Sequence, residues 1–508
     1  MKQTLGLILV LATGGLLAAC VRPGPTTEPW MLPPVQSGLT AQPTPFQPVL
    51  TYLPPTREPG APEQSPTPDP PRVLPTLRPN DETYIVQPLD TLGTIAQRYG
   101  VDLNTLIAAN KIENANLLEV GQSLIIPAPD PQSVGSDFKI LPDSELVYGP
   151  ASALFNIDVF IQTQGGYLAK YEEKVDDQLT GSAAIVARIA YEYSVNPRLL
   201  LAVLEYQSGW VTNPNIDPNQ DDFPMGYPDG NRPGLYRQLS WAANNLNHGY
   251  YSWRVNSIAS VVLPDGSVVP LSGSINAGTA GVQYFMSRLY NRGGWDKAVG
   301  ENGLYATYKK FFGFPYDLAV EPLIPAGLTQ PAMQLPLEPG ESWSFTGGPH
   351  AGWGDGSGWA AIDFAPPGEG LGCVQSNAWV TAVADGLIIR SGSGSVVLDL
   401  DGDGLEQTGW TVLYLHIETR DRVPAGTQVK AGDRIGHPSC EGGVSNGTHV
   451  HMARRYNGEW IPADGALPYN LEGWISQGTG VEYNGTLTKD GQVVEAWDRR
   501  VDANQISR

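Results

Sequence analysis

The chain has 508 residues, which at roughly 150 residues per domain predicts about three domains joined by linkers. Its 31 Lys and Arg stand against 52 Asp and Glu, and the formal net charge of −21 at pH 7 excludes a nucleic-acid binder, because most of the surface would repel phosphates. Three Cys in so long a chain exclude a disulfide-stapled scaffold.

Residues 1–20 have the pattern of a secretory signal peptide: one Lys, a short apolar run and then small residues. The run ends in Leu17-Ala18-Ala19-Cys20, which resembles the lipobox of bacterial lipoproteins. The resemblance implies that Cys20 is diacylated and becomes the mature N-terminus, which anchors the protein on the outer side of the cytoplasmic membrane. An ordinary signal peptide with a chance Cys is the alternative.

Residues 21–81 form a Pro-rich linker. Within them, residues 21–80 hold 18 of the 45 Pro and few large apolar side chains, so the stretch cannot bury a core. We expect an extended spacer that holds the following domains away from the membrane.

Residues 82–128 have the pattern of a βααβ unit, with strands at 84–86 and 123–126 and helices at 91–99 and 102–109. Together with Tyr99-Gly100-Val101 and Gly121-Gln122, this pattern resembles the LysM module over nearly its whole length. In that family two strand-to-helix loops form a groove for glycans that contain N-acetylglucosamine. The resemblance therefore implies glycan contacts at Asp90, Thr91, Leu92 and Leu118, with core packing as an equal alternative for the two Leu.

Residues 150–320 predict a helical domain, because apolar side chains recur at helical spacing over 182–193 and 198–207. Residues 195–210 resemble the start of the lysozyme-like soluble lytic transglycosylases. That family has its catalytic Glu before Ser-Gly at the helix end, whereas this chain has Gln207-Ser208-Gly209, and an amide cannot protonate a leaving oxygen. Glu205 lies about 200° further around the helix. We expect a degenerate domain, glycan-binding or structural, with little or no glycosidase activity.

Five of the six His lie beyond residue 340, and the sixth, His248, is expected on the surface of a helix. Residues 333–466 hold short apolar or alternating runs between Gly and Asp turns, which predicts an antiparallel β-sheet domain. In His449-Val450-His451 the two imidazoles project from one face of a strand, about 6 to 7 Å apart along it. One can bind a metal while the other meets a substrate, and Asp363 offers a carboxylate from another strand.

This domain resembles the lysostaphin-like zinc endopeptidases, also called the LytM or beta-lytic metallopeptidase type. The resemblance covers about 130 residues and rests on Asp363-Phe364-Ala365-Pro366, Ala382-Val383-Ala384-Asp385-Gly386, Tyr414-Leu415-His416, Gly432-Asp433-Arg434-Ile435-Gly436 and Gly447-Thr448-His449-Val450-His451. It implies that Asp363 and His451 bind zinc. It also implies that His416 and His449 orient the attacking water and stabilise the developing oxyanion.

One ligand departs from this pattern. The family has a His four residues before the Asp, and here that position is Trp359. Since catalytic zinc needs three protein ligands and an open fourth place, we predict that His350, thirteen residues before Asp363, completes the site through a Gly-rich loop. The alternative is a turn His beside a metal site that no longer functions.

Cys373 and Cys440 remain after processing, and outside the cytoplasm we expect them to form a disulfide, with free thiols as the alternative. Asp399, Asp401 and Asp403 are spaced like the start of a calcium loop, but a Trp occupies the place of the bidentate Glu, so we interpret the segment as a hairpin turn. Residues 467–508 form a C-terminal extension to which the sequence assigns no role.

These features predict a multidomain α+β protein with a βααβ LysM module, a helical lysozyme-like domain and an antiparallel β-sheet metallopeptidase domain. The predicted function is a zinc-dependent, lipid-anchored peptidoglycan hydrolase that faces the cell wall and cuts peptide stems or cross-bridges. A weak glycan-binding module on a tether raises the concentration of such an enzyme at an insoluble polymer. The alternative is a non-enzymatic peptidoglycan-binding scaffold or activator, and bound zinc distinguishes the two.

Overall fold

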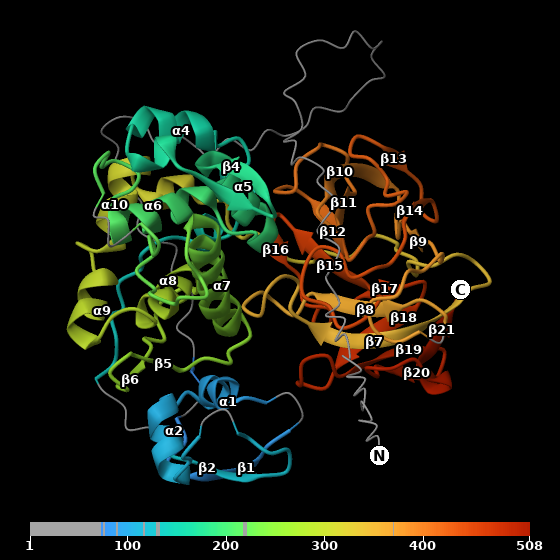
Figure 1. Cartoon of the computed structure of the whole chain (residues 1–508), viewed down its shortest axis with the longest axis horizontal. Coiled ribbons are helices and arrows are strands. Elements are labelled where there is room, and N and C mark those ends of the chain that lie inside the picture. The colour runs from blue at the N-terminus through green and yellow to red at the C-terminus, as the bar shows by residue number, and fades with distance from the viewer. Residues whose placement is uncertain are drawn as a thin grey trace, which may run out of the picture.

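The computed structural model describes residues 73–74, 77–87, 90–114, 117–128, 133–216, 221–368 and 370–508. They form a small N-terminal unit, a helical middle region and a β-rich C-terminal region (Figure 1). This arrangement confirms the predicted α+β class. The signal segment and Cys20 lie outside the described residues, so the lipid anchor stays a prediction. In the part of the chain that the structure describes, no helix combines the length and apolarity needed to cross a membrane.

The N-terminal unit has the predicted βααβ order. Its elements are β1 Glu82–Ile85, α1 Leu92–Tyr99, α2 Leu103–Asn110 and β2 Ser123–Ile126, and the two strands pair antiparallel. Asp102 caps α2 by accepting a hydrogen bond from the Thr105 main-chain N–H, which the helix itself leaves unpaired. Apolar side chains such as Ile95, Leu106 and Leu124 form a core of this unit's own.

The middle region is helical, with two short hairpins. Its helices are α3 Asp143–Leu146, α4 Ile157–Gln164, α5 Ser182–Tyr193, α6 Pro197–Ser208, α7 Leu235–Arg254, α8 Ala277–Ser287, α9 Arg292–Ala298 and α10 Leu304–Phe312. The hairpins pair β3 Glu172–Val175 with β4 Gln178–Gly181, and β5 Ser260–Val262 with β6 Val268–Pro270. Asn196 caps α6, Pro197 fills the first helical position and Gly209 ends the helix in the left-handed conformation. Helix α8 is buried along its whole length and packs against α7.

The C-terminal region is built on an antiparallel sheet with the strand order β13-β10-β11-β12-β15-β8-β7-β21, to which β16 adds by pairing with β15. These strands are β7 Ser342–His350, β8 Ala361–Ala365, β10 Gly386–Gly392, β11 Ser395–Asp399, β12 Trp410–Leu415, β13 Gln428–Val429, β15 Val450–Tyr456, β16 Glu459–Trp460 and β21 Gln505–Ser507. A separate pair joins β9 Val380–Thr381 to β14 Arg434–Gly436. The predicted antiparallel sheet is therefore present.

Residues 467–508 are part of this region rather than an appendage. They form a four-stranded antiparallel sheet of β17 Asn470–Leu471, β18 Trp474–Gly478, β19 Gly485–Lys489 and β20 Gln492–Glu495, and then the edge strand β21. Leu471, Leu487 and Ile506 are buried in the same core as Phe345 and Val450. The extension therefore completes the core of the β-rich region.

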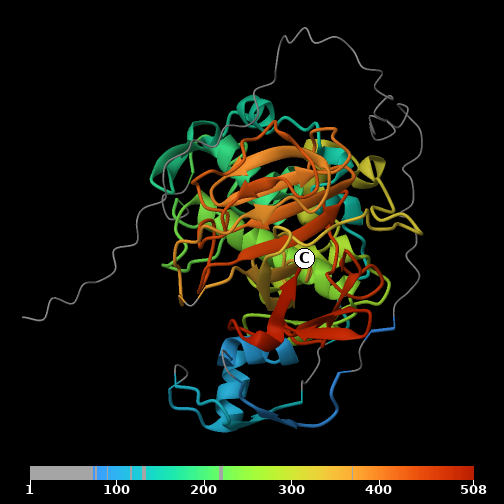
Figure 2. The same cartoon turned by 90° about the vertical axis from the view of Figure 1, so that its right-hand side faces the viewer.

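The helical region packs on one face of the large sheet, which lies in front of the helices in Figure 2. Ala361, Leu413 and Ala453 point to that face and join the core of the helical region, while their neighbours along each strand point to the other core. Because side chains two apart on a strand share a face, Asp363 and His451 project from this same side. One face of the sheet thus carries both chemistry-bearing side chains and the helical region.

Candidate metal centre and its neighbouring histidines

The candidate site lies where four adjacent strands end. The order β12-β15-β8-β7 places His451 of β15 directly opposite Asp363 of β8, and His350 is the last residue of β7. His416 directly follows β12, and His449 directly precedes β15. Antiparallel pairing therefore gathers five residues that are up to 101 positions apart along the chain.

Three of them converge as a group able to hold a metal ion. Nε2 of His350 lies 3.0 Å from Nδ1 of His451, and Oδ1 of Asp363 lies 3.2 Å and 3.3 Å from these two nitrogens. All three side chains are at least nine-tenths buried. The structure thus brings together the ligand set predicted from the sequence, with His350 included.

Both imidazoles in this group have their other nitrogen engaged. His350 donates through Nδ1 to the Gly348 carbonyl at 2.8 Å, and His451 donates through Nε2 to the Gly352 carbonyl at 3.0 Å. These bonds use the single proton of each neutral ring, so lone pairs of His350, His451 and Asp363 face one another across about 3 Å. Hydrogen bonds of this kind orient metal-binding His in proteins.

The Asp363 carboxylate adds a buried negative charge. Its Oδ1 accepts no hydrogen bond and is shielded from solvent. Burial opposes ionisation, but the imidazoles of His350 and His449 keep the pKa of Asp363 well below its usual value. Burial also opposes a charge on His350, whereas Asp363 raises the pKa of His350 overall. The group therefore favours a positive charge at its centre, and a divalent cation fits that place.

His416 and His449 stand beside this group, and Nε2 of His449 points toward it. Their rings lie 4.5 Å apart, and Nε2 of His449 is 3.7 Å from Asp363 Oδ2. His416 donates through Nδ1 to the Glu441 carbonyl at 2.9 Å, and His449 donates through Nδ1 to the Gly447 carbonyl at 2.7 Å. Burial, with His449 and His451 nearby, lowers the pKa of His416 to about 3. His416 is therefore a neutral imidazole, and because its proton is on Nδ1, its Nε2 carries the lone pair.

The His416 backbone is held in the left-handed region, with φ at +66°. A non-glycine residue rarely adopts this conformation, and such residues cluster at functional sites. The carbonyl of His416 accepts hydrogen bonds from the main chain and side chain of Ser439, which stabilise the turn. This turn directs the ring toward His449.

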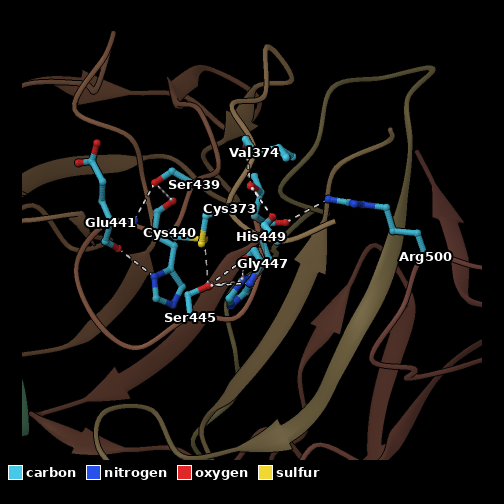
Figure 3. Close-up of a disulfide and its surroundings, with 12 residues drawn as sticks. Cys373, Val374, Ser439, Cys440, Glu441, Ser445, Gly447, His449 and Arg500 are labelled. Carbon is cyan, nitrogen blue, oxygen red and sulfur yellow. Dashed lines mark hydrogen bonds between the residues drawn. A yellow bond between two sulfur atoms is a disulfide. The ribbon is translucent and has the colours of Figure 1, made fainter. Parts of the chain in front are cut away.

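Residues 440–449, called the disulfide rim below, supply both carbonyls that orient His416 and His449. Cys440 of the rim is bonded to Cys373, with a Cα–Cα distance of 5.7 Å (Figure 3). Next to the disulfide, Thr448 donates its main-chain N–H to the Gly372 carbonyl and its hydroxyl to the Val374 carbonyl. The rim is thus tied, covalently and by hydrogen bonds, to the segment that follows β8.

Three groups at the site were not predicted from the sequence. The Gly352 carbonyl could not be identified because any residue offers a carbonyl. Tyr483, from the C-terminal extension, stacks on the His350 ring with centroids 4.2 Å apart and remains 52 % exposed. Glu482 beside it accepts a hydrogen bond from the Ala351 N–H at 3.2 Å. No motif in the sequence signals these contacts.

The unusual spacing between His350 and Asp363 is explained by a loop. Residues 351–360, called the metal-site loop below, connect β7 to β8, so that His350 pairs with Ala361 after two irregularities in the ladder. Trp359, at the family's usual ligand position, is a loop residue whose carbonyl accepts a hydrogen bond from Ala463. The loop thus returns His350 to the end of the strands.

Glu205 and Gln207 in the middle region have structural partners. The Glu205 carboxylate accepts hydrogen bonds from the N–H groups of Val211 and Thr212 and from the Thr212 hydroxyl, and so caps the turn after α6. Gln207 accepts a hydrogen bond from the Tyr290 hydroxyl at 2.6 Å. The geometry of α6 thus offers no carboxylate poised to donate a proton.

His248 is not the surface residue that the sequence predicted. Its ring stacks on Tyr284, with centroids 4.6 Å apart, and burial lowers the pKa of His248 to about 4. The expectation failed because the polar neighbours of His248 along the helix hid its position against α8. It lies outside the candidate site.

In the N-terminal unit, Leu92 is only 2 % exposed and belongs to the core, while Leu118 is half-buried against it. Asp90 accepts hydrogen bonds from the Tyr84 hydroxyl and the Gln87 N–H, and Thr91 is exposed. The burial of Leu92 favours the packing alternative for that side chain. Glycan contact by Asp90, Thr91 and Leu118 stays a prediction.

Asp399, Asp401 and Asp403 lie in the turn between β11 and β12. The Asp399 carboxylate accepts three main-chain N–H bonds from within this turn, which accounts for its burial. The hairpin-turn interpretation therefore agrees with the structure.

Comparison with known protein families divides the chain in the same way. Residues 84–127 match the LysM domain, residues 139–324 match the N-terminal domain of LasA, and residues 367–462 match peptidase family M23. The M23 match includes His416, His449 and His451 but begins after His350 and Asp363, which the fold adds. The middle region, for which the sequence suggested a lysozyme-like origin, is thus similar to a LasA domain.

Among curated proteins, the chain is 27 % identical over 307 residues to the protease LasA of Pseudomonas aeruginosa strain UCBPP-PA14, covering 55 % of this chain and 68 % of that protein. It is 48 % identical over 48 residues to the N-acetylmuramoyl-L-alanine amidase XlyA of Bacillus subtilis strain 168, covering 9 % of this chain and 16 % of that protein. Among solved structures, pseudoalterin, a novel M23 metalloprotease from the deep sea, is 25 % identical with a TM-score of 0.28, covering 34 % of this chain and 97 % of that chain.

The family match, the similarity to a protease and the ligand geometry lead to one conclusion. The C-terminal region is a metallopeptidase domain of the M23 type, and His350, Asp363 and His451 form its metal site.

Proposed function

We propose that the protein is a peptidoglycan hydrolase, a zinc-dependent endopeptidase that cuts the stem or cross-bridge peptides of the bacterial cell wall. The observation that carries this proposal is the convergence of His350, Asp363 and His451 beside a second pair, His416 and His449. Metal-assisted hydrolysis of an amide needs three protein ligands for the metal and nearby groups that interact with the attacking water. The two imidazoles are such groups.

The donor set favours zinc. Two neutral imidazole nitrogens and one carboxylate oxygen match the ligands and the number of a catalytic zinc site, which keeps its fourth place for water. The buried, unbonded Oδ1 of Asp363 is the atom that such an ion would satisfy. Bound there, zinc would supply a Lewis acid that lowers the pKa of a water molecule and polarises the scissile carbonyl.

The remaining chemistry belongs to His416 and His449. Since both rings donate through Nδ1, their Nε2 atoms are free to accept a proton from the attacking water. The protonated ring can then stabilise the oxyanion that develops on the substrate carbonyl and return a proton to the leaving amine. Nε2 of His449 lies 3.7 Å from Asp363 Oδ2, which places this ring beside the metal ligands.

The other regions support an activity at the cell wall. The LysM match and the predicted contacts at Asp90, Thr91 and Leu118 support binding to the glycan strands of peptidoglycan, which would keep the peptidase near its substrate. The predicted lipid on Cys20 and the Pro-rich linker would tether the enzyme outside the cytoplasmic membrane. The Cys373–Cys440 disulfide agrees with an oxidising compartment.

Digestion of purified, protein-free sacculi tests the proposal. We expect the wild type to release fragments with new amino and carboxyl termini at peptide bonds, to lose this activity after treatment with a chelator and to regain it with zinc. Intact peptides with cut glycan strands, or a zinc-loaded enzyme that leaves sacculi untouched, would contradict the proposed function. The Cys20→Ser variant should leave the membrane fraction without losing hydrolysis in solution.

A further inference from the structure

The metal-site loop has a composition that does not favour one conformation. Its residues 352, 354, 356 and 358 are all Gly, and Gly354 has a positive φ of +65°. Glycine loses more backbone freedom on folding than any other residue, so an unsupported loop of this kind samples many conformations. Yet this loop begins at the ligand His350, and its Gly352 carbonyl accepts the hydrogen bond that orients His451. Something must therefore order it.

One side chain of the helical region, Asn244 in the middle of α7, anchors the tip of the loop. Its Oδ1 accepts hydrogen bonds from the N–H groups of Asp355 at 3.2 Å and Gly356 at 3.0 Å, and its Nδ2 donates to the Asp355 carboxylate. One amide thus satisfies three polar atoms at the tip of the loop. Two of these atoms are main-chain groups, so the contact fixes the path of the backbone.

The glycines allow the loop to lie this close. A methyl group at Gly356 would collide with the Asn244 carbonyl oxygen, and one at Gly354 would collide with the Asn244 side chain. Around them, Trp353 contacts Tyr193 edge to face, with ring centroids 6.4 Å apart. Within the loop, Gly352 donates its N–H to the Gly358 carbonyl at 3.0 Å, which connects the anchored tip to the carbonyl beside His451.

We propose that Asn244 is a positioning residue of the metal centre: by anchoring the metal-site loop to α7, it holds the Gly352 carbonyl against His451 and keeps His350 in place. The middle region then contributes to metal binding although it supplies no ligand. This inference rests on the metal site of the proposed function and adds a residue that lies more than a hundred positions before the first ligand. Outer groups that orient a metal-binding His typically change metal affinity by about 10- to 100-fold when they are removed.

The test exchanges the side chains of Asn244 and Asp355. The two side chains have the same shape, and they differ only in that Asn ends in an amide and Asp in a carboxylate. N244D would place a carboxylate against Asp355, whereas N244D/D355N restores one amide facing one carboxylate with donor and acceptor exchanged. The matched control is N245D, since Asn245 is the next residue of α7 and bonds within the helix, to the Trp241 carbonyl at 2.8 Å. Asp355→Ala, on the exposed side of the contact, is a second variant that leaves the helical core unchanged.

The measurements are the rate at which the zinc-loaded full chain loses its metal to a chromogenic chelator, and hydrogen exchange in residues 351–359. We expect N244D to release zinc about 10- to 100-fold faster, with faster exchange in the loop. N245D should behave as the wild type, D355A should show an intermediate effect, and N244D/D355N should return toward the wild-type rate.

Equal release rates for N244D and N245D, or a double variant no better than N244D, would overturn the inference while leaving the proposed function intact. A wild type that takes up no zinc would instead refute the proposed function.

Discussion

The site has two halves: the metal half, formed by the three ligands, and the histidine half, formed by His416 and His449. Both halves orient their imidazoles by the same kind of hydrogen bond, but different parts of the chain hold the acceptor carbonyls. Each of the four imidazoles donates one N–H to a main-chain carbonyl. On the metal side, the Gly352 carbonyl belongs to a Gly-rich loop that hydrogen bonds attach to another region of the chain. On the histidine side, the carbonyls of Glu441 and Gly447 belong to a rim that a disulfide ties within the domain. Substitutions in one half should therefore affect zinc binding, and substitutions in the other half should affect turnover without loss of zinc.

The largest effect is expected from substitution of the metal ligands. His451→Ala or Asp363→Ala removes one of three ligands, so zinc content should fall to the level of the chelator-treated protein, and hydrolysis should fall with it. Elemental analysis of the purified variants measures the metal. Retention of one zinc per chain by either variant would show that the metal lies elsewhere.

The second largest effect is expected on the histidine side. His416→Ala and His449→Ala should keep their zinc, yet turnover should fall by about 10²- to 10⁴-fold, the usual contribution of a positioned acid or base. Turnover of a soluble peptide substrate is measured on preparations whose zinc content is known. Parallel loss of zinc and turnover would remove the distinction between the two halves.

Removing the disulfide should affect the histidine half alone. With the two Cys 67 positions apart in the sequence, the C373S/C440S variant should lose about 4 kcal/mol in the free energy of unfolding, because the unfolded chain regains loop freedom. Displacement of the disulfide rim should lower turnover by about 10- to 100-fold. Zinc content should stay at one per chain, and its loss would show that the rim also supports the ligands.

The smallest effect is expected from Glu205→Gln in the helical region. Its carboxylate caps a turn, so we expect a loss of about 1 kcal/mol in stability and turnover within about twofold of the wild type. Denaturant unfolding and analysis of sacculus fragments measure both quantities. If the wild type cut glycan strands and the variant did not, the helical region would have chemistry of its own rather than a supporting role.

Helices and strands that depend on interactions between residues close in the sequence could be predicted from the sequence. The predicted bounds of the four elements of the N-terminal unit agree with the structure to within two residues, because apolar spacing and the Asp102 cap act within a few positions. The same holds for β15, which carries His451 and directly follows His449. His350 was predicted only by counting the ligands that zinc requires, since the length of a loop does not fix where its ends meet.

Contacts between distant segments could not be predicted. Asn244 is one of several Asn in a polar stretch of α7, and nothing near it in the sequence indicates that its amide binds a loop 111 residues later. Tyr483 reaches His350 only because the C-terminal strands fold back onto β7. His248 was placed on the surface for the same reason, because its partner Tyr284 belongs to another helix.

A crystal structure of the zinc-loaded protein, with anomalous scattering recorded at the zinc absorption edge, tests the central division of the site most directly. We expect a single peak about 2.0 to 2.2 Å from Nε2 of His350, Nδ1 of His451 and an Asp363 oxygen, with the Nε2 atoms of His416 and His449 beyond bonding distance. A peak bonded to His416 or His449, or one that leaves His350 unbound, would contradict it.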